Sequence, residues 1–232
     1  MKTRGIFITG TDTGVGKTFI GTGIAAALRG QGIDVGVMKP AETGCLMKKG
    51  VLVPRDALKL IMAGGVDDPL DIVNPYRFRD PLAPAIAAAR EGMKIGIRRI
   101  VSCFRALARR HEYMIVEGAG GIMVPLTTSY TYLDLVRALD LPVLIVARPG
   151  LGTINHTLLT VTVVRSHRSR VAGIVINNRS RTKPGLAERT GPPFIEQVSG
   201  VPIIGHVTYG QKDMSAIMRY LMTSKQENPL CP

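Results

Sequence analysis

The chain has 232 residues, 45% of them hydrophobic, so it can bury a sizeable core. We expect one domain over residues 1–222 and a disordered tail at 223–232. The net charge of +13 comes from basic residues that are dispersed and not interleaved with aromatic ones, which argues against a nucleic-acid partner. No apolar run approaches the ~18 residues of a membrane span, and no room is left for a signal peptide before the first strand. Three cysteines without a CxxC pair argue against a zinc site and favour a cytoplasmic protein.

The first predicted element is a buried strand at Ile6–Ile8, followed by a loop with three glycines and then a helix over Phe19–Arg29. This order is typical of a phosphate-binding loop, in which backbone N–H groups and the helix N-terminus face phosphate oxygens. Lys17 is expected to reach the β- and γ-phosphates, and the Thr18 hydroxyl to hold Mg²⁺. The loop is one residue longer than the pattern GxxxxGK[ST], because Gly10 lies six residues before Gly16.

The second predicted strand, Val35–Met38, ends at Lys39, and a loop over Ala41–Gly44 follows. Ligands of open α/β sheets bind at the carboxyl ends of the strands. A lysine at this place can therefore bind a second anion beside the site of Lys17. Without the glycine loop and Lys17, the better interpretation of Lys39 would be a surface lysine at a strand end.

The next segments are shorter and less regular. Residues 45–55 predict a loop or a short hairpin, and Asp56 leads a helix at Ala57–Met62, where an acid commonly caps the first turn. A short strand at Asn74–Phe78, an alanine-rich helix from Asp80 to Gly92 and an amphipathic helix over Ile95–Arg110 follow.

The third clear strand, Tyr113–Glu117, ends in one acid and runs into Gly118–Gly121. In phosphate-binding-loop enzymes an acid at this position helps to hold Mg²⁺. Because the carboxyl ends of parallel strands meet at one edge of a sheet, we expect Glu117 to lie near Lys17 and Thr18.

The rest of the chain continues the alternation of strands and helices. Strands are predicted at Pro142–Ala147, Val171–Asn177 and Val201–Val207, helices near Thr131–Leu139 and Thr153–Arg165, and a mobile surface loop at Arg179–Gly191. The alternation predicts an α/β fold, a single domain of the P-loop NTPase type, with a mostly parallel sheet flanked by helices on both faces.

Several blocks of the sequence, in the same order, resemble the dethiobiotin synthetase family from about Gly5 to Val207. They are GTDTGVGKT in the first loop, KPAETG at Lys39–Gly44, Asp56, PLAP at Pro81–Pro84, VEGAGG around Glu117, GLGTINHTLLT at Gly150–Thr160 and VINN at Val175–Asn178. The resemblance implies a ligase of biotin biosynthesis that uses ATP and Mg²⁺. It would condense 7,8-diaminononanoate with CO₂ through a carbamate and a carbamic-phosphoric mixed anhydride, and release dethiobiotin, ADP and phosphate.

The resemblance also implies roles for individual residues. The ATP phosphates would be bound by Thr13, Gly14, Val15, Gly16 and Lys17, and Mg²⁺ by Thr18, Asp56 and Glu117. Lys39 and Thr43 would hold the carbamate and the transferred phosphoryl group, so that Lys17, Lys39, Thr13 and Thr43 form the catalytic set. Asn177 would read the adenine edge, and Gly152, Thr153, Ile154 and Asn155 would receive the substrate carboxylate across a homodimer interface.

The sequence departs from the family pattern at three places. Gly14 stands where some members carry an acid, and Arg55 precedes Asp56 where a small polar residue is usual. After the last strand, His206–Tyr209 lacks the proline-rich turn expected beside adenine, so the preference for the nucleotide base is the least determined property.

Two classes of protein other than this ligase, and a third and weaker one, fit parts of the pattern. A regulatory ATPase switch of the ParA/MinD kind has the same sheet, but its additional lysine near the start of the loop is replaced here by Thr11 and Asp12. A relative that amidates a corrinoid would need a glutaminase domain for which the chain has no room. A module that only binds nucleotide is distinguished from the ligase by whether diaminononanoate triggers ADP release.

Overall fold

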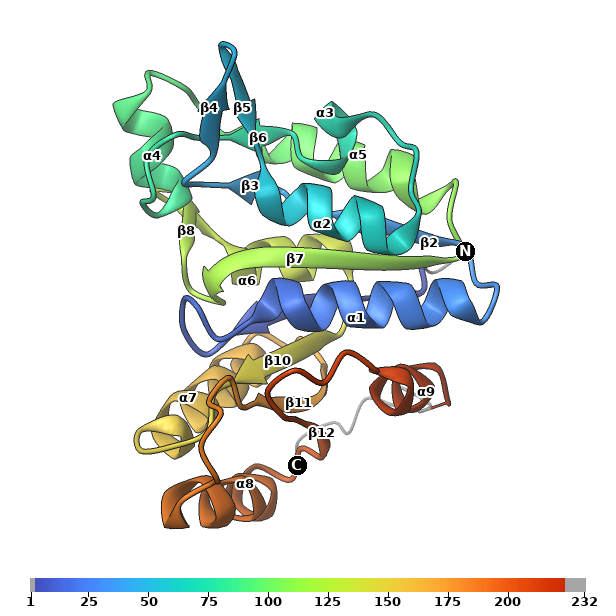
Figure 1. The fold of residues 1–232 in the computed structure, drawn as a ribbon. Coiled ribbons are helices and arrows are strands. Elements are labelled where there is room, and N and C mark those ends of the chain that lie inside the picture. The colour runs from blue at the N-terminus through green and yellow to red at the C-terminus, as the bar shows by residue number, and fades with distance from the viewer. Residues whose placement is uncertain (1–2, 224–232) are drawn as a thin grey trace.

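The structure is a computed structural model that describes residues 3–223. Its centre is one parallel sheet of six strands in the order β12, β11, β10, β1, β7 and β2 (Figure 1). These strands are Ile203–Val207, Val171–Asn177, Val143–Ala147, Gly5–Gly10, Tyr113–Gly121 and Val35–Met38. The predicted tail begins at Thr223, which is the last residue of helix α9, and its other residues lie outside the described part of the chain.

The strands are apolar because both faces of the sheet are covered, as is usual for parallel sheets. All six residues of β1 are buried, and β1 lies between β10 and β7. Ile8 of β1 pairs with Glu117 of β7, so the sheet register itself brings this acid beside the strand that leads into the glycine loop. The predicted proximity of Glu117 to that loop is confirmed.

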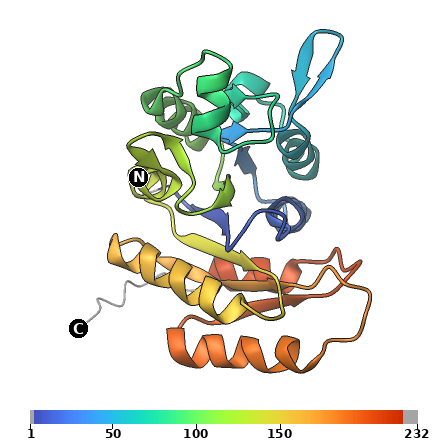
Figure 2. The ribbon, with the colours of Figure 1, turned by 90° about the vertical axis from the view of Figure 1, so that its left-hand side faces the viewer.

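Helices cover both faces of the sheet (Figures 1 and 2). One face carries α1 (Lys17–Gly30), α2 (Arg55–Gly64) and α9 (Ser215–Thr223). The other carries α5 (Ile97–Ala108), α6 (Tyr132–Leu139), α7 (Thr153–Ser166) and α8 (Leu186–Ser199). The predicted α/β fold is confirmed, and so is the arrangement of helices on both faces.

Short elements lie above the carboxyl edge of β2 and β7. Strand β3 (Ala41–Glu42) pairs in parallel with β6 (Tyr76–Arg77), and β4 (Leu46–Lys48) forms a hairpin with β5 (Val51–Val53). The hairpin expected within 45–55 is thus present, whereas the strand expected at 74–78 has only two residues. Helices α3 (Leu70–Val73) and α4 (Pro84–Arg90) and the pair β8 (Pro125–Thr127) and β9 (Tyr130–Thr131) complete this region.

The prediction of a loop over Arg179–Gly191 is wrong from residue 186, where α8 begins. Its Pro192 and Pro193 cannot donate backbone hydrogen bonds, and this argues against a helix when the sequence is read alone. The helix forms because Pro192 and Ile195 are buried on its inner side, where it packs against α7. Tertiary packing overrides local propensity here.

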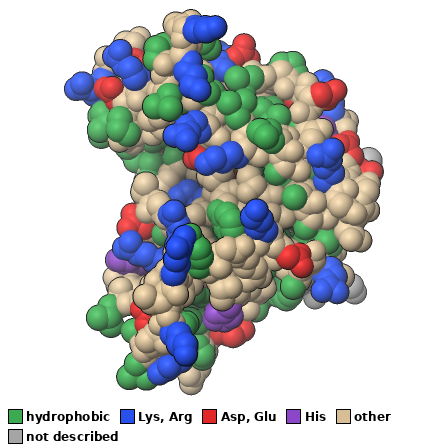
Figure 3. All heavy atoms as spheres, viewed as in Figure 1, with side chains coloured by type: hydrophobic (Ala, Val, Ile, Leu, Met, Phe, Trp, Pro, Cys, Tyr) green, Lys and Arg blue, Asp and Glu red, His purple; other side chains and the backbone are tan. Residues whose placement is uncertain are grey.

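Basic side chains are spread over the face of the molecule that Figure 3 shows. In Figure 3, Lys and Arg side chains occur over the upper, middle and lower parts of the face that is shown. Between residues 3 and 223, the structure contains no helix of the length and apolarity that a membrane crossing requires.

Candidate active site

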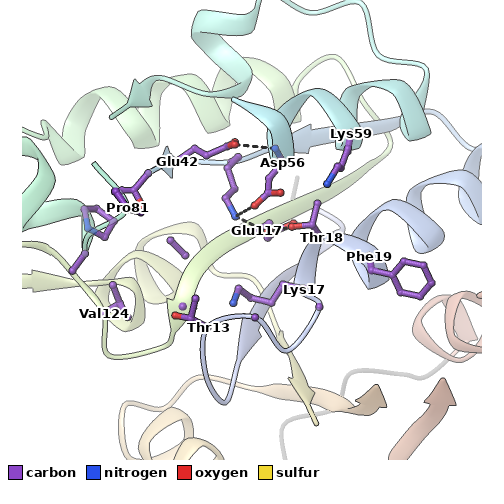
Figure 4. Close-up of a pocket in the computed structure, with 18 of the residues that line it drawn as sticks. Thr13, Lys17, Thr18, Phe19, Glu42, Asp56, Lys59, Pro81, Glu117 and Val124 are labelled. Carbon is purple, nitrogen blue, oxygen red and sulfur yellow. Dashed lines mark hydrogen bonds and ion pairs between the residues drawn. The ribbon is translucent and has the colours of Figure 1, made fainter. Parts of the chain in front are cut away.

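A cavity of about 730 Å³ opens at the carboxyl edge of β1, β7 and β2, between the glycine loop and the start of α2 (Figure 4). The predicted residues that line it are Thr13, Gly14, Gly16, Lys17, Thr18, Lys39, Thr43, Asp56 and Glu117. They come from four separate segments of the chain, so the fold brings together most of the set that the sequence predicts.

The loop between β1 and α1 depends on glycine at two positions. Gly14 and Gly16 have φ angles of 75° and 98°, a region that side chains rarely adopt. A β-carbon on Gly16 would lie 2.1 Å from Nδ2 of Asn177, because this turn packs directly against the end of β11.

Lys17, the first residue of α1, is buried at the floor of the cavity, and its Nζ lies 3.3 Å from the carbonyl oxygen of Asp12. Burial, followed by the nearby charge of Lys39, lowers the pKa of Lys17 to about 8. The ammonium is still the main form at neutral pH, and an anion in the cavity would stabilise it further.

Glu117 is the centre of the polar contacts in the cavity. Its Oε1 accepts a hydrogen bond of 2.5 Å from Nζ of Lys39 and one of 2.8 Å from Oγ1 of Thr18. Nζ of Lys39 also lies 3.6 Å from Oδ2 of Asp56 and donates to the carbonyl oxygen of Gly118. Burial alone would lower the pKa of Lys39, but the carboxylates of Glu117 and Asp56 outweigh it and raise that pKa above its usual value.

The oxygen atoms around Glu117 fit a magnesium ion. Oε2 of Glu117 is buried and has no hydrogen-bond partner, and Thr18 and Asp56 place further oxygens in the same cavity. Within residues 3–223 no group of three or more His, Cys, Asp or Glu side chains could hold a metal by itself. A hydroxyl and two carboxylates suit Mg²⁺ if phosphate oxygens complete its coordination.

Asn177 and Val15 lie outside this cavity but contact each other. Nδ2 of Asn177 donates to the carbonyl oxygen of Val15 at 2.8 Å, so the side chain holds the glycine loop in place. A second cavity of about 430 Å³, lined by Gly14, Arg148, Asn177 and residues of the 178–184 segment, adjoins the loop. The expected contact of Asn177 with adenine stays a prediction, and the structure gives this side chain a bond that the sequence did not reveal.

The Gly152–Asn155 segment is not part of the cavity in this chain. Gly152 precedes α7 with a φ angle of 86°, no side chain caps the helix, and the Thr153 hydroxyl is buried without a partner. Its role toward a substrate stays a prediction.

Three charged residues that line the cavity are absent from the predicted set: Glu42, Lys59 and Arg179. Arg179 donates to the carbonyl oxygen of Gly14 at 2.7 Å, and Lys59 lies one helical turn after Asp56 on α2. The sequence offered one signal, the acid within KPAETG, for Glu42 and none for the other two.

Comparisons with known proteins show which family the chain resembles. A family model described as an AAA domain matches residues 4–215. Proteins named ATP-dependent dethiobiotin synthetase BioD are 49% identical in Bacillus licheniformis, over 87% of this chain and 84% of that protein, and 49% identical in Anaeromyxobacter sp. (strain Fw109-5), over 94% and 95%. The one from Thermodesulfovibrio yellowstonii is 41% identical over 88% of both.

Solved structures with the same fold are more distant in sequence. A ParA family ATPase from Chlorobium tepidum has a TM-score of 0.53 and 19% identity, and covers 97% of this chain and 95% of its own. The MinD cell division protein of Aquifex aeolicus has a TM-score of 0.56 and 19% identity, over 94% of this chain and 87% of its own. At this identity the likeness concerns the fold alone, so it does not favour a regulatory ATPase.

Proposed function

This chain belongs to the ATP-dependent dethiobiotin synthetase family, within the proteins that share the AAA domain, and from that premise we propose how its residues carry out the reaction. The activity is the ATP-dependent synthesis of dethiobiotin in biotin biosynthesis. The observation that carries the proposal is the convergence of Lys17, Lys39, Thr18 and Glu117 on one cavity behind a phosphate-binding loop.

The reaction requires two anions to meet. One amine of 7,8-diaminononanoate captures CO₂ as a carbamate, and a carbamate oxygen then attacks the γ-phosphorus of ATP, which releases ADP. The second amine attacks the carbonyl carbon of the mixed anhydride, phosphate leaves, and the ureido ring closes. The last step is intramolecular, so correct placement of the intermediate supplies much of its acceleration.

The residues of the cavity offset the repulsion between carbamate and γ-phosphate. Lys17 and Lys39 place two ammonium groups in the cavity, where fixed positive charge stabilises the negative charge that develops on the phosphoryl oxygens. Thr13 and Thr43 line the same cavity, and their hydroxyls can donate to these oxygens, while backbone N–H groups of the Gly14–Gly16 turn bind the other ATP phosphates.

We assign Mg²⁺ to the oxygens of Thr18, Asp56 and Glu117 together with the ATP phosphates. When bound there, the ion would supply positive charge against the γ-phosphoryl oxygens. The partnerless Oε2 of Glu117 supports this assignment. The ammonium of Lys39 lies close to both carboxylates and offsets part of their negative charge.

Three further properties belong to the proposal. The chain would act in the cytoplasm as a homodimer, with the partner's segment equivalent to Gly152–Asn155 holding the substrate carboxylate, and Asn177 would contact adenine. Helix N-termini suit carboxylates, and no side chain caps the start of α7, although the N–H of Thr153 donates to the carbonyl oxygen of Gly150; this supports the use of this segment. Diaminononanoate carries its carboxylate far from its amines, so an anchor outside the ATP cavity is required.

The test is incubation of the purified protein with ATP, Mg²⁺, bicarbonate and diaminononanoate, followed by detection of dethiobiotin by mass. We expect dethiobiotin and an ADP release that depends on diaminononanoate. Lys17→Ala should keep the fold and lose turnover, because one charge-assisted contact to a developing oxyanion is worth about 2.7–4 kcal/mol. ADP release that is independent of diaminononanoate, with no dethiobiotin formed, would instead indicate an ATPase of another kind.

A further inference from the structure

Glu42 is a buried carboxylate in the cavity for which the chemistry above has no use. It belongs to β3, only 5% of it is exposed, and its backbone carbonyl accepts a hydrogen bond of 2.9 Å from the N–H of Phe78. The short pairing of β3 with β6 therefore fixes where this side chain starts. Figure 4 shows the carboxylate directed toward the beginning of α2.

Both carboxylate oxygens of Glu42 bind backbone donors of α2. Oε1 accepts from the N–H of Asp56 at 2.8 Å, and Oε2 accepts from the N–H of Ala57 at 2.9 Å. The N-cap position of α2 is Pro54, and no side chain next to the helix caps it. Since the first N–H groups of a helix lack partners within the helix, a residue from a different element satisfies them here.

These two bonds contact the backbone of the helix turn that carries Asp56. The Asp56 backbone is held by Glu42, and its carboxylate lies 3.6 Å from the ammonium of Lys39, which stands three residues before Glu42 in the same segment. Between Glu42 and Asp56 the chain forms the β4–β5 hairpin, whose residues Leu46, Met47 and Val51 are exposed. The carboxylate of Glu42 therefore links the two ends of the segment that contains this exposed hairpin, and it keeps Asp56 near Lys39.

We propose that Glu42 is a positioning residue for the magnesium and phosphoryl-transfer site, which acts by holding the first turn of α2 so that Asp56 faces Lys39 and Glu117. The proposal rests on the metal role assigned to Asp56 above. Residues that orient metal ligands typically change metal affinity or activity 10- to 100-fold when they are removed. A helix cap with no such role would change stability alone.

The test compares four variants: Glu42→Ala, Glu42→Gln, Asp56→Asn and the double variant with Glu42→Ala and Asp56→Asn. For each, binding of a non-hydrolysable ATP analogue is measured by calorimetry across a range of Mg²⁺ concentrations, and Mn²⁺ binding to the complex by electron paramagnetic resonance. Asp213→Ala is the matched control, because Asp213 also accepts a hydrogen bond from the first residue of a helix, at 2.8 Å from the N–H of Ser215, but lies outside the cavity. Thermal unfolding without Mg²⁺ records stability separately.

We expect Glu42→Ala to raise the Mg²⁺ concentration for half-maximal analogue binding roughly 10-fold or more. Glu42→Gln, which keeps one carbonyl acceptor and still folds if the alanine variant does not, should show a smaller increase. Asp213→Ala should lower only the unfolding temperature. In the Asp56→Asn background the loss of Glu42 should have no further effect on Mg²⁺ dependence, because both residues act through one carboxylate.

Three results would overturn the proposal, and they are distinguishable. If Asp56→Asn raises the Mg²⁺ requirement but both Glu42 variants keep the wild-type value, Glu42 is only a helix cap. If the two effects add fully, Glu42 acts independently of Asp56, and the proposed positioning role is wrong. If Asp56→Asn itself leaves Mg²⁺ dependence unchanged, the metal role of Asp56 fails, and the proposal for Glu42 fails with it.

Discussion

Lys39 is the residue on which the charges of the cavity converge. It is almost completely buried, and it touches both carboxylates that the proposed metal would use. Removing one member of a buried ion pair leaves the other charge uncompensated, which typically costs about 3–5 kcal/mol. Lys39 therefore has a structural role beside its proposed role toward the carbamate and the phosphoryl group.

Lys39→Met should lower turnover roughly 10²- to 10³-fold, as expected for the loss of one oxyanion contact. It should also lower the free energy of unfolding, because the carboxylate of Glu117 loses its countercharge. In the double variant with Lys39→Met and Glu117→Gln, stability should recover while turnover stays low. Turnover assays and urea unfolding of the three proteins check both parts. A single Lys39→Met variant as stable as the wild type would show that the pair contributes no stability.

Backbone geometry limits which residues the glycine loop between β1 and α1 can contain. Gly14 and Gly16 both have positive φ angles, but their surroundings differ. No atom lies within 4 Å of a β-carbon built on Gly14, whereas one on Gly16 would overlap the side chain of Asn177. A side chain at position 14 would therefore meet only the strain of the positive φ angle, whereas one at position 16 would also overlap a neighbouring residue.

Gly16→Ala should destabilise the protein and weaken nucleotide binding much more than Gly14→Ala, the matched control. The control variant meets only the left-handed conformational strain, about 1–2 kcal/mol. Gly16→Ala adds the overlap with Nδ2 of Asn177 and displaces the loop. ADP affinity and urea unfolding of both variants measure the difference. Equal losses in the two variants would mean that the contact with Asn177 does not limit the loop.

A cluster of charged side chains lies at the amino edge of the sheet, on the side opposite the cavity. It joins connecting segments that are far apart in the sequence. Nδ1 of His111 lies 2.8 Å from Oδ1 of Asp34, and its Nε2 lies 2.6 Å from Oδ2 of Asp68. Nε of Arg110 lies 3.0 Å from Oδ1 of Asp68. These residues join the starts of β2 and β7 to the segment between α2 and α3. Burial would lower the pKa of His111, but its hydrogen bonds with the two carboxylates outweigh this and raise the pKa.

Stability should therefore fall as pH rises, through the loss of the His111 proton. The folded-state pKa lies above the unfolded value of about 6.5, so the contribution is complete below about pH 6.5 and is lost as pH rises through the folded pKa. Urea unfolding of the wild type and of His111→Gln between pH 6 and 9 should show a stability difference that is largest at pH 6 and then decreases. His206→Gln, at an exposed position, is the control. A difference that does not change with pH would contradict a charged His111.

Two exposed apolar side chains suggest how the protomers of the proposed homodimer contact each other. Leu151, at the loop before α7, is 96% exposed, and Leu82, on the wall of the cavity, is also exposed. Exposed apolar side chains at both places fit a contact in which the start of α7 in one protomer covers the cavity of its partner.

We expect sedimentation to show a homodimer, and Asn155→Ala to raise the KM for diaminononanoate with little change in ATP affinity. Mixing this variant with Lys39→Met should restore activity, because one site of each mixed dimer would contain neither change. The mixed dimers are formed by unfolding and refolding the two variants together, and the same mixture without this step is the control. A fully active monomer, or no recovery in mixed dimers, would rule out a shared site.

The sequence alone determined the parts of this protein that depend on local pattern. Buried β-branched runs with helices between them predicted a parallel sheet. In such a sheet the carboxyl ends of all strands lie at one edge. The strand, glycine loop and helix around Lys17, the lysine after the second strand and the acid ending the third were therefore enough to predict the cluster that the structure contains.

Tertiary structure decided the contacts between residues that are distant in sequence. The bond from Asn177 to the glycine loop spans 162 residues, and the cap that Glu42 supplies to α2 bridges a hairpin. Helix α8 forms in spite of its two prolines, because burial against α7 outweighs local propensity. No sequence pattern encodes such contacts, since each depends on where two separately formed elements meet. For the same reason the fold, and not the spacing of residues, placed Gly152–Asn155 outside the cavity of its own chain.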